Sequence, residues 1–279
     1  PQLRDTVGEA TTKLEVILPV AAAARPPTAR RWPRLAELKI RCPDLATLEA
    51  LGAETWSAMR ALSLERPRWG APGEKASKFD APSARALAAA LRRMPALRAL
   101  ELLNLALPDA AAEELFHSCR AGGVPRLRSL TVTRAKLTRA AARALAATGW
   151  RLEELNLDEN AALGAAGVAA LLAAPTFAIR CLTLPACGLD TAALLALANA
   201  PWPFEELEIS DNDFSGPEAA PALAALSRHA HLGTLSVESC LLSAAGFKAL
   251  VEAAWPVLTQ LHAYGAKVAF DGPHTLGAP

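Results

Sequence analysis

A spacing of apolar residues that recurs along this chain limits what it can fold into. In the segment 204–212, apolar residues stand at positions one, four and six, and Asn212 stands at position nine. The same spacing occurs in nine copies, several of them weaker, and an Ala- and Leu-rich stretch follows the copies. The copies begin at residues 35, 59, 97, 127, 152, 179, 204, 232 and 258. A near-constant period of this kind indicates an array of similar units, each of which buries its apolar face against its neighbours.

Each copy predicts a short strand followed by a helix, because apolar spacing typical of a helix returns after position nine. Positions one, four and six should point inward, and the residues between them should face outward. An Asn at position nine can bond backbone groups that a tight turn leaves unpaired. Cys187 and Cys240 occupy the same position, so we expect them to be buried there rather than reactive. Leu105 and Ala135 also occupy it and cannot make that bond, which predicts looser turns in those two copies.

The pattern resembles that of the leucine-rich repeat family, L-x-x-L-x-L-x-x-N/C-x-L, over about residues 35–265. A full helix after each strand makes it similar to the ribonuclease-inhibitor-like subtype. The Ala-rich helices and the Trp-Pro or X-Pro joints before many strands look like arrays that are common in green algae. The resemblance implies an α/β fold, a right-handed solenoid shaped like a horseshoe with a parallel concave sheet, convex helices and about nine repeats.

The repeat positions also divide the chain. Residues 1–34 are expected to be a degenerate first repeat or an N-terminal cap, 35–265 the array, and 266–279 a C-terminal tail that frays. The start-to-start distance from 59 to 97 is the longest in the array, and residues 66–83 carry the excess. Their Gly, Pro and mixed charges predict an exposed loop, either a plain linker or a binding loop. A Trp beside an X-Pro joint, as at Trp202, is expected to cover the core between units.

Composition and motifs argue against several classes of function. The 279 residues carry a formal net charge of +1, so no overall field points to nucleic acid or to an anionic membrane. Five cysteines without a CxxC pair argue against both a disulfide framework and a zinc site. No apolar run approaches the ~20 residues of a membrane span. We therefore expect an intracellular, cytoplasmic protein that needs no cofactor and no metal.

Nothing in the sequence points to catalysis. No P-loop, GxGxxG or GxSxG motif occurs. Glu113 and His117 are spaced to share a helix face, and residues 228–231 (RHAH) precede a strand, but both groups are expected to be solvated. We therefore expect the chain not to be an enzyme.

The expected concave face carries an uneven distribution of charge. Its residues occupy positions three, five, seven and eight of each copy, and the N-terminal copies mix bases with acids there. The copies at 152, 204 and 232 place seven acids and no base at these positions. The predicted partner-binding residues are Glu154, Asp158, Glu159, Glu206, Glu208, Asp211, Glu238, His262 and Tyr264. Like charges on adjacent strands repel, so either a basic protein surface meets these acids or water alone solvates them.

The family resemblance implies a non-catalytic protein–protein interaction module, or scaffold, that binds a protein partner on its concave face. A basic surface on that partner fits the acids, and neither nucleic acid nor membrane is expected as a partner. One alternative is an inhibitor or regulator of a basic enzyme. Another is the substrate-binding part of a ubiquitin-ligase receptor, although residues 1–34 show no recognisable F-box-like helices. A GTPase-activating array would need a supporting Arg or Asn that the sequence does not single out.

Overall fold

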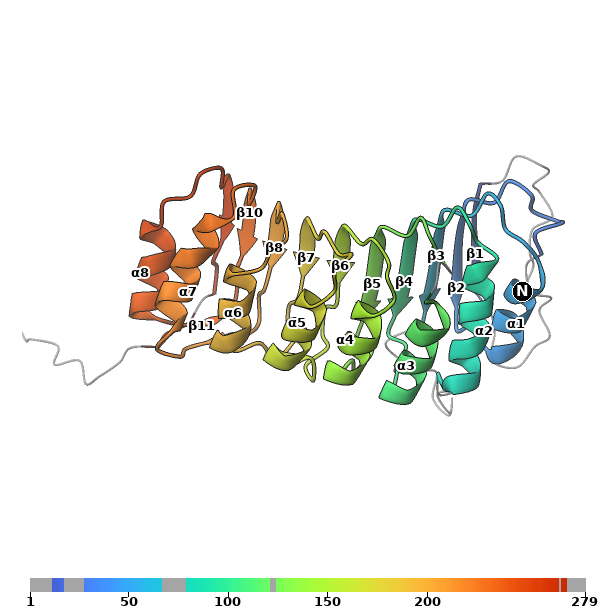
Figure 1. Ribbon diagram of the computed structural model, residues 1–279, viewed down its shortest axis with the longest axis horizontal. Coiled ribbons are helices and arrows are strands. Elements are labelled where there is room, and N and C mark those ends of the chain that lie inside the picture. Colours follow the sequence, from blue (N-terminus) through green and yellow to red (C-terminus); the bar gives the residue numbers. More distant parts are fainter. Residues whose placement is uncertain (1–11, 18–27, 67–78, 121–123, 266, 270–279) are drawn as a thin grey trace, which may run out of the picture.

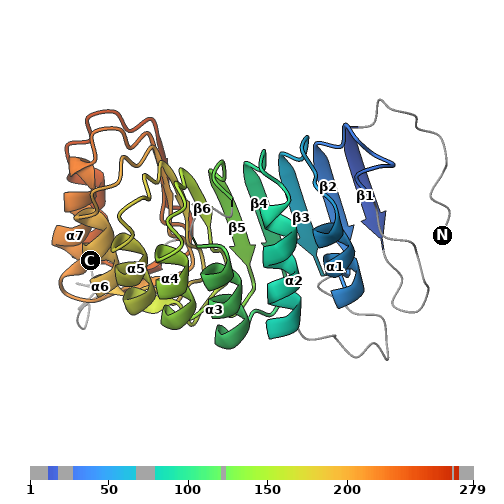
Figure 2. The ribbon, with the colours of Figure 1, turned by 45° about the vertical axis from the view of Figure 1, so that its right-hand side comes forward.

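A computed structural model describes residues 12–17, 28–66, 79–120, 124–265 and 267–269. Strands and helices alternate along these residues and build an elongated α/β solenoid (Figure 1). The strands form one layer, and the helices lie side by side in a second layer that covers one face of the sheet (Figures 1 and 2). The α/β solenoid architecture predicted from the repeated spacing is therefore confirmed.

Ten strands form one parallel sheet in chain order. They are β1 (Lys13–Ile17), β2 (Glu37–Arg41), β3 (Ala61–Glu65), β4 (Ala99–Leu103), β5 (Ser129–Thr133), β6 (Glu154–Asn156), β7 (Cys181–Thr183), β8 (Glu206–Glu208), β10 (Thr234–Ser236) and β12 (Gln260–His262). The helices are α1 (Leu45–Ala53), α2 (Ala81–Arg92), α3 (Asp109–Ser118), α4 (Arg139–Ala146), α5 (Gly164–Leu172), α6 (Thr191–Ala198), α7 (Ala219–Ala225) with a 3-10 turn at Leu226–Arg228, and α8 (Ala244–Glu252).

The inward leucines form a continuous line through the core. Residues at motif position four pair from strand to strand across the whole sheet. Leu155 and Leu207 in this line are each 1% exposed, as the spacing predicts. Leu261, at the end of the line in β12, is 39% exposed because no further strand covers it among the described residues.

Position nine is buried and bonded to the backbone, as expected. Asn212 Oδ1 accepts hydrogen bonds from the backbone N–H groups of Cys187 and Leu189 in the preceding unit. Its Nδ2 donates to the carbonyl oxygen of Leu184 in the preceding unit and to those of Ile209 and Ser210 in its own unit. Asn160, two units earlier in the chain, makes the equivalent set of bonds. The thiols of Cys187 and Cys240 donate instead to a single carbonyl each, at 3.1 and 3.3 Å.

The turn at Ala135 is bonded from the following unit, although its own side chain cannot bond the backbone. The N–H groups of Ala135 and Leu137 are bonded to Asn160 from the following unit, and Leu107 N donates to Ala135 O. A neighbouring unit therefore supplies the bonds that the local side chain cannot make.

A left-handed residue at position eight shapes almost every turn. Cys42, Asn104, Arg134, Glu159, Ala186, Asp211 and Ser239 all have φ between 49° and 56°, and Gly265 has φ 68°. In one turn, a close backbone contact also leaves no room for any side chain larger than that of glycine. Gly188 has φ 64°, and a Cβ there would lie 2.3 Å from the carbonyl oxygen of Ala161.

Described residues at both ends of the array and at the end of the expected loop belong to strands and to a helix. Within residues 1–34, β1 extends the sheet by one strand. Within 266–279, Lys267–Ala269 (β13) joins a small parallel sheet with β11 (Leu241–Ser243) and β9 (Asp213–Phe214). Most of the expected loop at 66–83, residues 67–78, lies outside the described residues. Its last residues, however, form the start of α2, where Asp80 accepts a hydrogen bond from Ser83 N.

The expectations for Trp202 and for residues 228–231 have different outcomes. Trp202 is 4% exposed and packs against Phe177 and Phe204, so it covers the core as predicted. The expectation that residues 228–231 are solvated is wrong for His229. Its Nε2 lies 3.0 Å from Leu197 O, and its ring meets Phe204 edge-on at 4.9 Å. Burial lowers the pKa of His229, which disfavours its charged form.

Candidate interaction surface

The face of the sheet that carries no helices presents the alternate residues of each strand, and we call it the open face (Figure 2). It corresponds to the concave surface expected from the sequence. In its N-terminal part, cross-strand ion pairs join the charges. Lys13 lies 2.8 Å from Glu37, Lys39 lies 2.8 Å from Glu65, and Arg41 lies 3.0 Å from Glu15. This part of the open face is therefore close to internally neutral.

The acids of the C-terminal part gather around β8. Glu208 is half-buried, and burial is the largest cause that raises its pKa. Asp158, Glu238 and Asp211 raise it further through their charges, while His262 opposes them. These four acids, Asp158, Glu208, Asp211 and Glu238, are the acidic cluster. The parallel register brings them together from the units of β6, β8 and β10, although they lie up to 80 residues apart in the chain.

Two serines hold the middle of this cluster in place. Ser210 is 5% exposed, and its Oγ lies 2.8 Å from Ser236 Oγ on the neighbouring strand. The Ser210 hydroxyl also accepts a hydrogen bond from Glu238 N at 3.2 Å. The backbone that carries Glu238 is therefore tied to the unit that carries Glu208 and Asp211.

Two further acids flank a thiol at the amino end of the same strands. Glu154 and Glu206 are exposed, and the register places them on either side of Cys181. Burial, followed by the charges of Glu206 and Glu154, raises the pKa of Cys181. The thiol is thus held in its protonated form, which is the poorer nucleophile and metal ligand.

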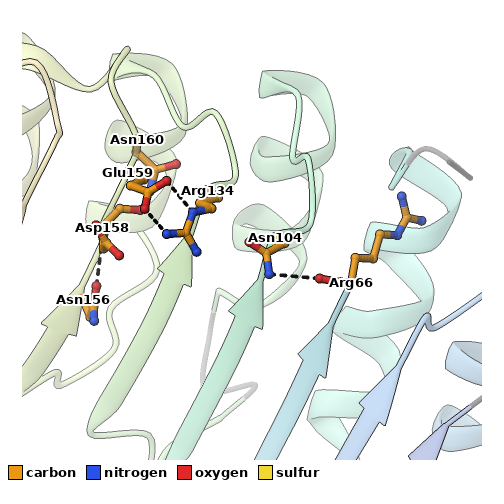
Figure 3. Close-up of polar contacts among 7 residues, drawn as sticks. All are labelled: Arg66, Asn104, Arg134, Asn156, Asp158, Glu159 and Asn160. Atoms are coloured by element: carbon orange, nitrogen blue, oxygen red, sulfur yellow. Dashed lines mark hydrogen bonds and ion pairs between the residues drawn. The ribbon is translucent and has the colours of Figure 1, made fainter. Parts of the chain in front are cut away.

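The remaining predicted residues differ in their surroundings. Glu159 is held by the guanidinium of Arg134 from the preceding unit, through two contacts at the carboxyl ends of β5 and β6 (Figure 3). The charge of Glu159 is therefore balanced. Its base, Arg134, belongs to the copy at 127, which lies outside the three copies that hold the seven acids. Both residues occupy motif position eight, so comparing that position between consecutive copies would have revealed the pair. Asp158 N is also fixed, by a 2.9 Å bond to Asn156 Oδ1 (Figure 3).

At the C-terminal end of the open face, His262 Nδ1 lies 3.8 Å from Glu238 Oε1. Tyr264 is 88% exposed, so its ring is available at this end of the surface. The structure thus brings Glu154, Glu206, the acidic cluster and His262 onto one face, with Tyr264 beside them and Glu159 already paired.

The chemistry of this surface is that of fixed negative charge. Among the described residues, no group of three or more His, Cys, Asp or Glu side chains has an arrangement that could hold a metal ion. No helix in the described part of the chain is long and apolar enough to cross a membrane. Carboxylates on an exposed face can instead form charge-assisted hydrogen bonds and ion pairs with lysine and arginine side chains.

No protein-family model matches this chain, and no curated protein matches it either.

Proposed function

We propose that this chain is a leucine-rich repeat protein of the ribonuclease-inhibitor-like subtype, and that it is a non-catalytic module binding a basic protein partner. The partner would dock on the C-terminal half of the open face. The resemblance in the repeated motif supports the family, and the parallel sheet with its single helical layer is compatible with it. The acidic cluster is the single observation that carries the choice of partner.

The contrast between the two halves of the open face supports this choice. In the N-terminal half, the chain neutralises its own charges across neighbouring strands, as in the pair Lys39–Glu65. In the C-terminal half, burial and three acids raise the pKa of Glu208, and no lysine or arginine of the described residues is among the causes of that shift. Like charges on adjacent strands cost roughly 0.2–1 kcal/mol per pair. A basic partner would relieve that repulsion and gain long-range attraction during association.

The test is a charge reversal that leaves the turn backbone untouched. Asp211 has a positive φ, so the triple variant Glu206→Lys, Glu208→Lys, Glu238→Lys avoids that position. Affinity capture from lysate, with quantitative mass spectrometry, compares this variant with the wild type. A direct titration with an octalysine peptide accompanies it. We expect the captured basic protein to be lost and octalysine to bind at least tenfold more weakly.

A matched control carries the same change in net charge on the helices. Glu49, Glu113 and Glu252 are exposed on α1, α3 and α8, and their triple Lys variant should keep both the partner and the peptide. Circular dichroism first establishes that all three proteins fold. Binding should also weaken as salt rises, because screening at 0.15 M acts over about 8 Å. Equal capture by both triple variants would mean that the acids are only a solvated face.

A further inference from the structure

A second charged row lies at the amino ends of the strands, at the border of the open face. It consists of the residues at motif position two of consecutive units, whose backbones are directly bonded to one another. Arg98 N donates to Arg60 O at 2.8 Å, and Arg128 N donates to Arg98 O at 2.9 Å. The row continues through Glu153, Arg180 and Glu205 with bonds of 2.7–2.8 Å.

The C-terminal part of this row balances its own charge. Arg128 Nε lies 3.0 Å from Glu153 Oε1. Arg180 Nε lies 2.9 Å from Glu205 Oε1. Base and acid therefore alternate from one strand to the next, which is the arrangement that cross-strand electrostatics favours.

The N-terminal part of the row does the opposite. Arg60 and Arg98 are neighbours on adjacent strands, and Arg34 and Arg126 add two further guanidinium groups just before β2 and β5. We call Arg34, Arg60, Arg98 and Arg126 the arginine edge. All four are exposed, and within the described part of the chain none of them makes an ion pair. Like charges on adjacent strands repel, and a bound anion would relieve that repulsion.

The arginine edge lines a hollow of about 670 Å³. Glu37, the acid among the described residues of its wall, is already bound by Lys13 at 2.8 Å, so it does not balance the arginines. The hydroxyl group of Ser57 also lines the hollow. The backbone N–H groups of Arg60 and Arg98 are used up between strands, so the side chains would have to hold any ligand.

We propose that this hollow binds a small molecule that carries several phosphate groups. The proposal goes beyond the partner-binding function, because it concerns another surface of the array. Guanidinium groups match phosphate oxygens with paired hydrogen bonds. Strands lie roughly 4.8 Å apart, so one phosphate reaches two neighbouring arginines, and four arginines over roughly 14 Å fit several phosphates. The volume is within the range of small-molecule sites, roughly 300–1,000 Å³.

The lining argues against a single-stranded nucleic acid held by base stacking in the same place. None of the described residues that line the hollow is aromatic, so none of them would stack on a base. The four guanidinium groups would hold a ligand through its phosphates. The shared chemistry is therefore a cluster of phosphates on a compact scaffold.

The decisive variant is Arg98→Glu. The substituted carboxylate would lie between Arg60 and Arg128 and would restore the alternation seen further along the row. Isothermal titration of the wild type with tripolyphosphate should show saturable binding, and the variant should bind at least tenfold more weakly. Its melting temperature should equal or exceed that of the wild type, so loss of binding cannot reflect loss of fold.

The control is Arg143→Glu on the exposed face of α4, which changes the net charge equally and should leave binding unchanged. Citrate at the same ionic strength tests phosphate against carboxylate, and equal affinity for citrate would overturn the proposal. So would the absence of saturable binding, or equal binding by the wild type and Arg98→Glu. A peptide with two adjacent phosphoserines, or vesicles containing phosphatidylinositol bisphosphate, should bind no more tightly than tripolyphosphate. Tighter binding of either would replace the small ligand with a phosphoprotein or a membrane.

Discussion

At the scale of single residues, the buried asparagines join one unit of the array to the next. Asn212 is 6% exposed and satisfies two N–H groups and three carbonyl groups in an interior that water does not reach. A buried polar group left without a partner costs about 1–3 kcal/mol. One side chain therefore protects the backbone of two turns at once.

Asn212→Ala should lower the free energy of unfolding by about 2–4 kcal/mol, because it leaves the buried N–H groups of Cys187 and Leu189 without a hydrogen-bond acceptor. Urea denaturation followed by circular dichroism measures the change. Asn199→Ala is the control, since Asn199 is exposed at the end of α6 and donates only to Leu195 O. A loss below about 1 kcal/mol for Asn212→Ala would mean that the turns find other partners.

Glu208 makes stability depend on pH in an unusual direction. Its pKa is raised in the folded protein above the ordinary 4.5, so the folded state binds its proton more tightly than the unfolded state does. The charged carboxylate therefore destabilises the fold above the raised pKa, and this cost disappears below the ordinary value. Glu208→Gln should be more stable than the wild type at pH 7, by roughly 0.2–1 kcal/mol.

Thermal unfolding of both proteins between pH 4 and 8 tests this reasoning. The difference in melting temperature should vanish toward the acid end. Glu113→Gln, which removes an exposed carboxylate from α3, should change little throughout. A Glu208→Gln variant less stable than the wild type at pH 7 would contradict the raised pKa.

Single residues also show where sequence reasoning stops. The inward leucines and the residues at position nine follow from spacing alone, because a strand alternates its faces. The left-handed turn at position eight does not, since Arg134, Glu159 and Ala186 give no local sign of a positive φ. The bonds on either side impose that conformation: Glu159 N donates to Pro185 O of the next unit. A residue's conformation is thus set by neighbours some 25 positions away, which propensity cannot capture.

At the scale of elements, each strand is stabilised by the neighbours on its two sides. β8 lies between β7 and β10, whereas β12 ends the sheet within the described residues. The leucines at the same motif position record the difference, with Leu207 1% exposed and Leu261 39% exposed. Leucines at the same motif position therefore contribute different amounts to stability, according to whether their strand has a neighbour on both sides.

Leu207→Ala should lower the free energy of unfolding by about 2–5 kcal/mol, because it leaves a cavity between two covered units. Leu261→Ala, at the uncovered end, should cost less than about 1 kcal/mol. Chemical denaturation of both variants provides the comparison, and each serves as the control for the other. Equal losses would show that β12 is covered as fully as β8 in solution.

Some elements were readable from the sequence and others were not. The beginning of α2 is readable, because Asp80 stands before Ala-Pro-Ser, a helix-capping sequence within the expected loop at 66–83. The small sheet of β9, β11 and β13 was not, because strands of two or three residues leave no periodic pattern. Their pairing exists only because the solenoid places those segments side by side.

At the scale of the whole molecule, the formal net charge of +1 conceals three separate electrostatic surfaces. The N-terminal half of the open face neutralises itself, its C-terminal half is acidic, and the arginine edge is basic. Composition could predict none of this, while motif positions predicted the acids of the open face. In the arginine edge, Arg60 and Arg98 share motif position two of consecutive copies, whereas Arg34 and Arg126 precede their copies and are placed beside them only by the folded structure.

The same architecture decides how a disturbance spreads. Strands pair with their immediate neighbours, and each helix packs on the next one, so a unit senses mainly the two units beside it. Stability in such an array is the sum of local and nearest-neighbour terms, and opening can occur in part of the chain.

Leu155→Ala should therefore raise amide hydrogen exchange most in β5, β6 and β7, and least in β2. Hydrogen exchange followed by mass spectrometry resolves these segments, and Leu261→Ala is the matched control, with its effect confined to β10 and β12. An equal increase in exchange along every strand would instead show that the array opens as one cooperative unit.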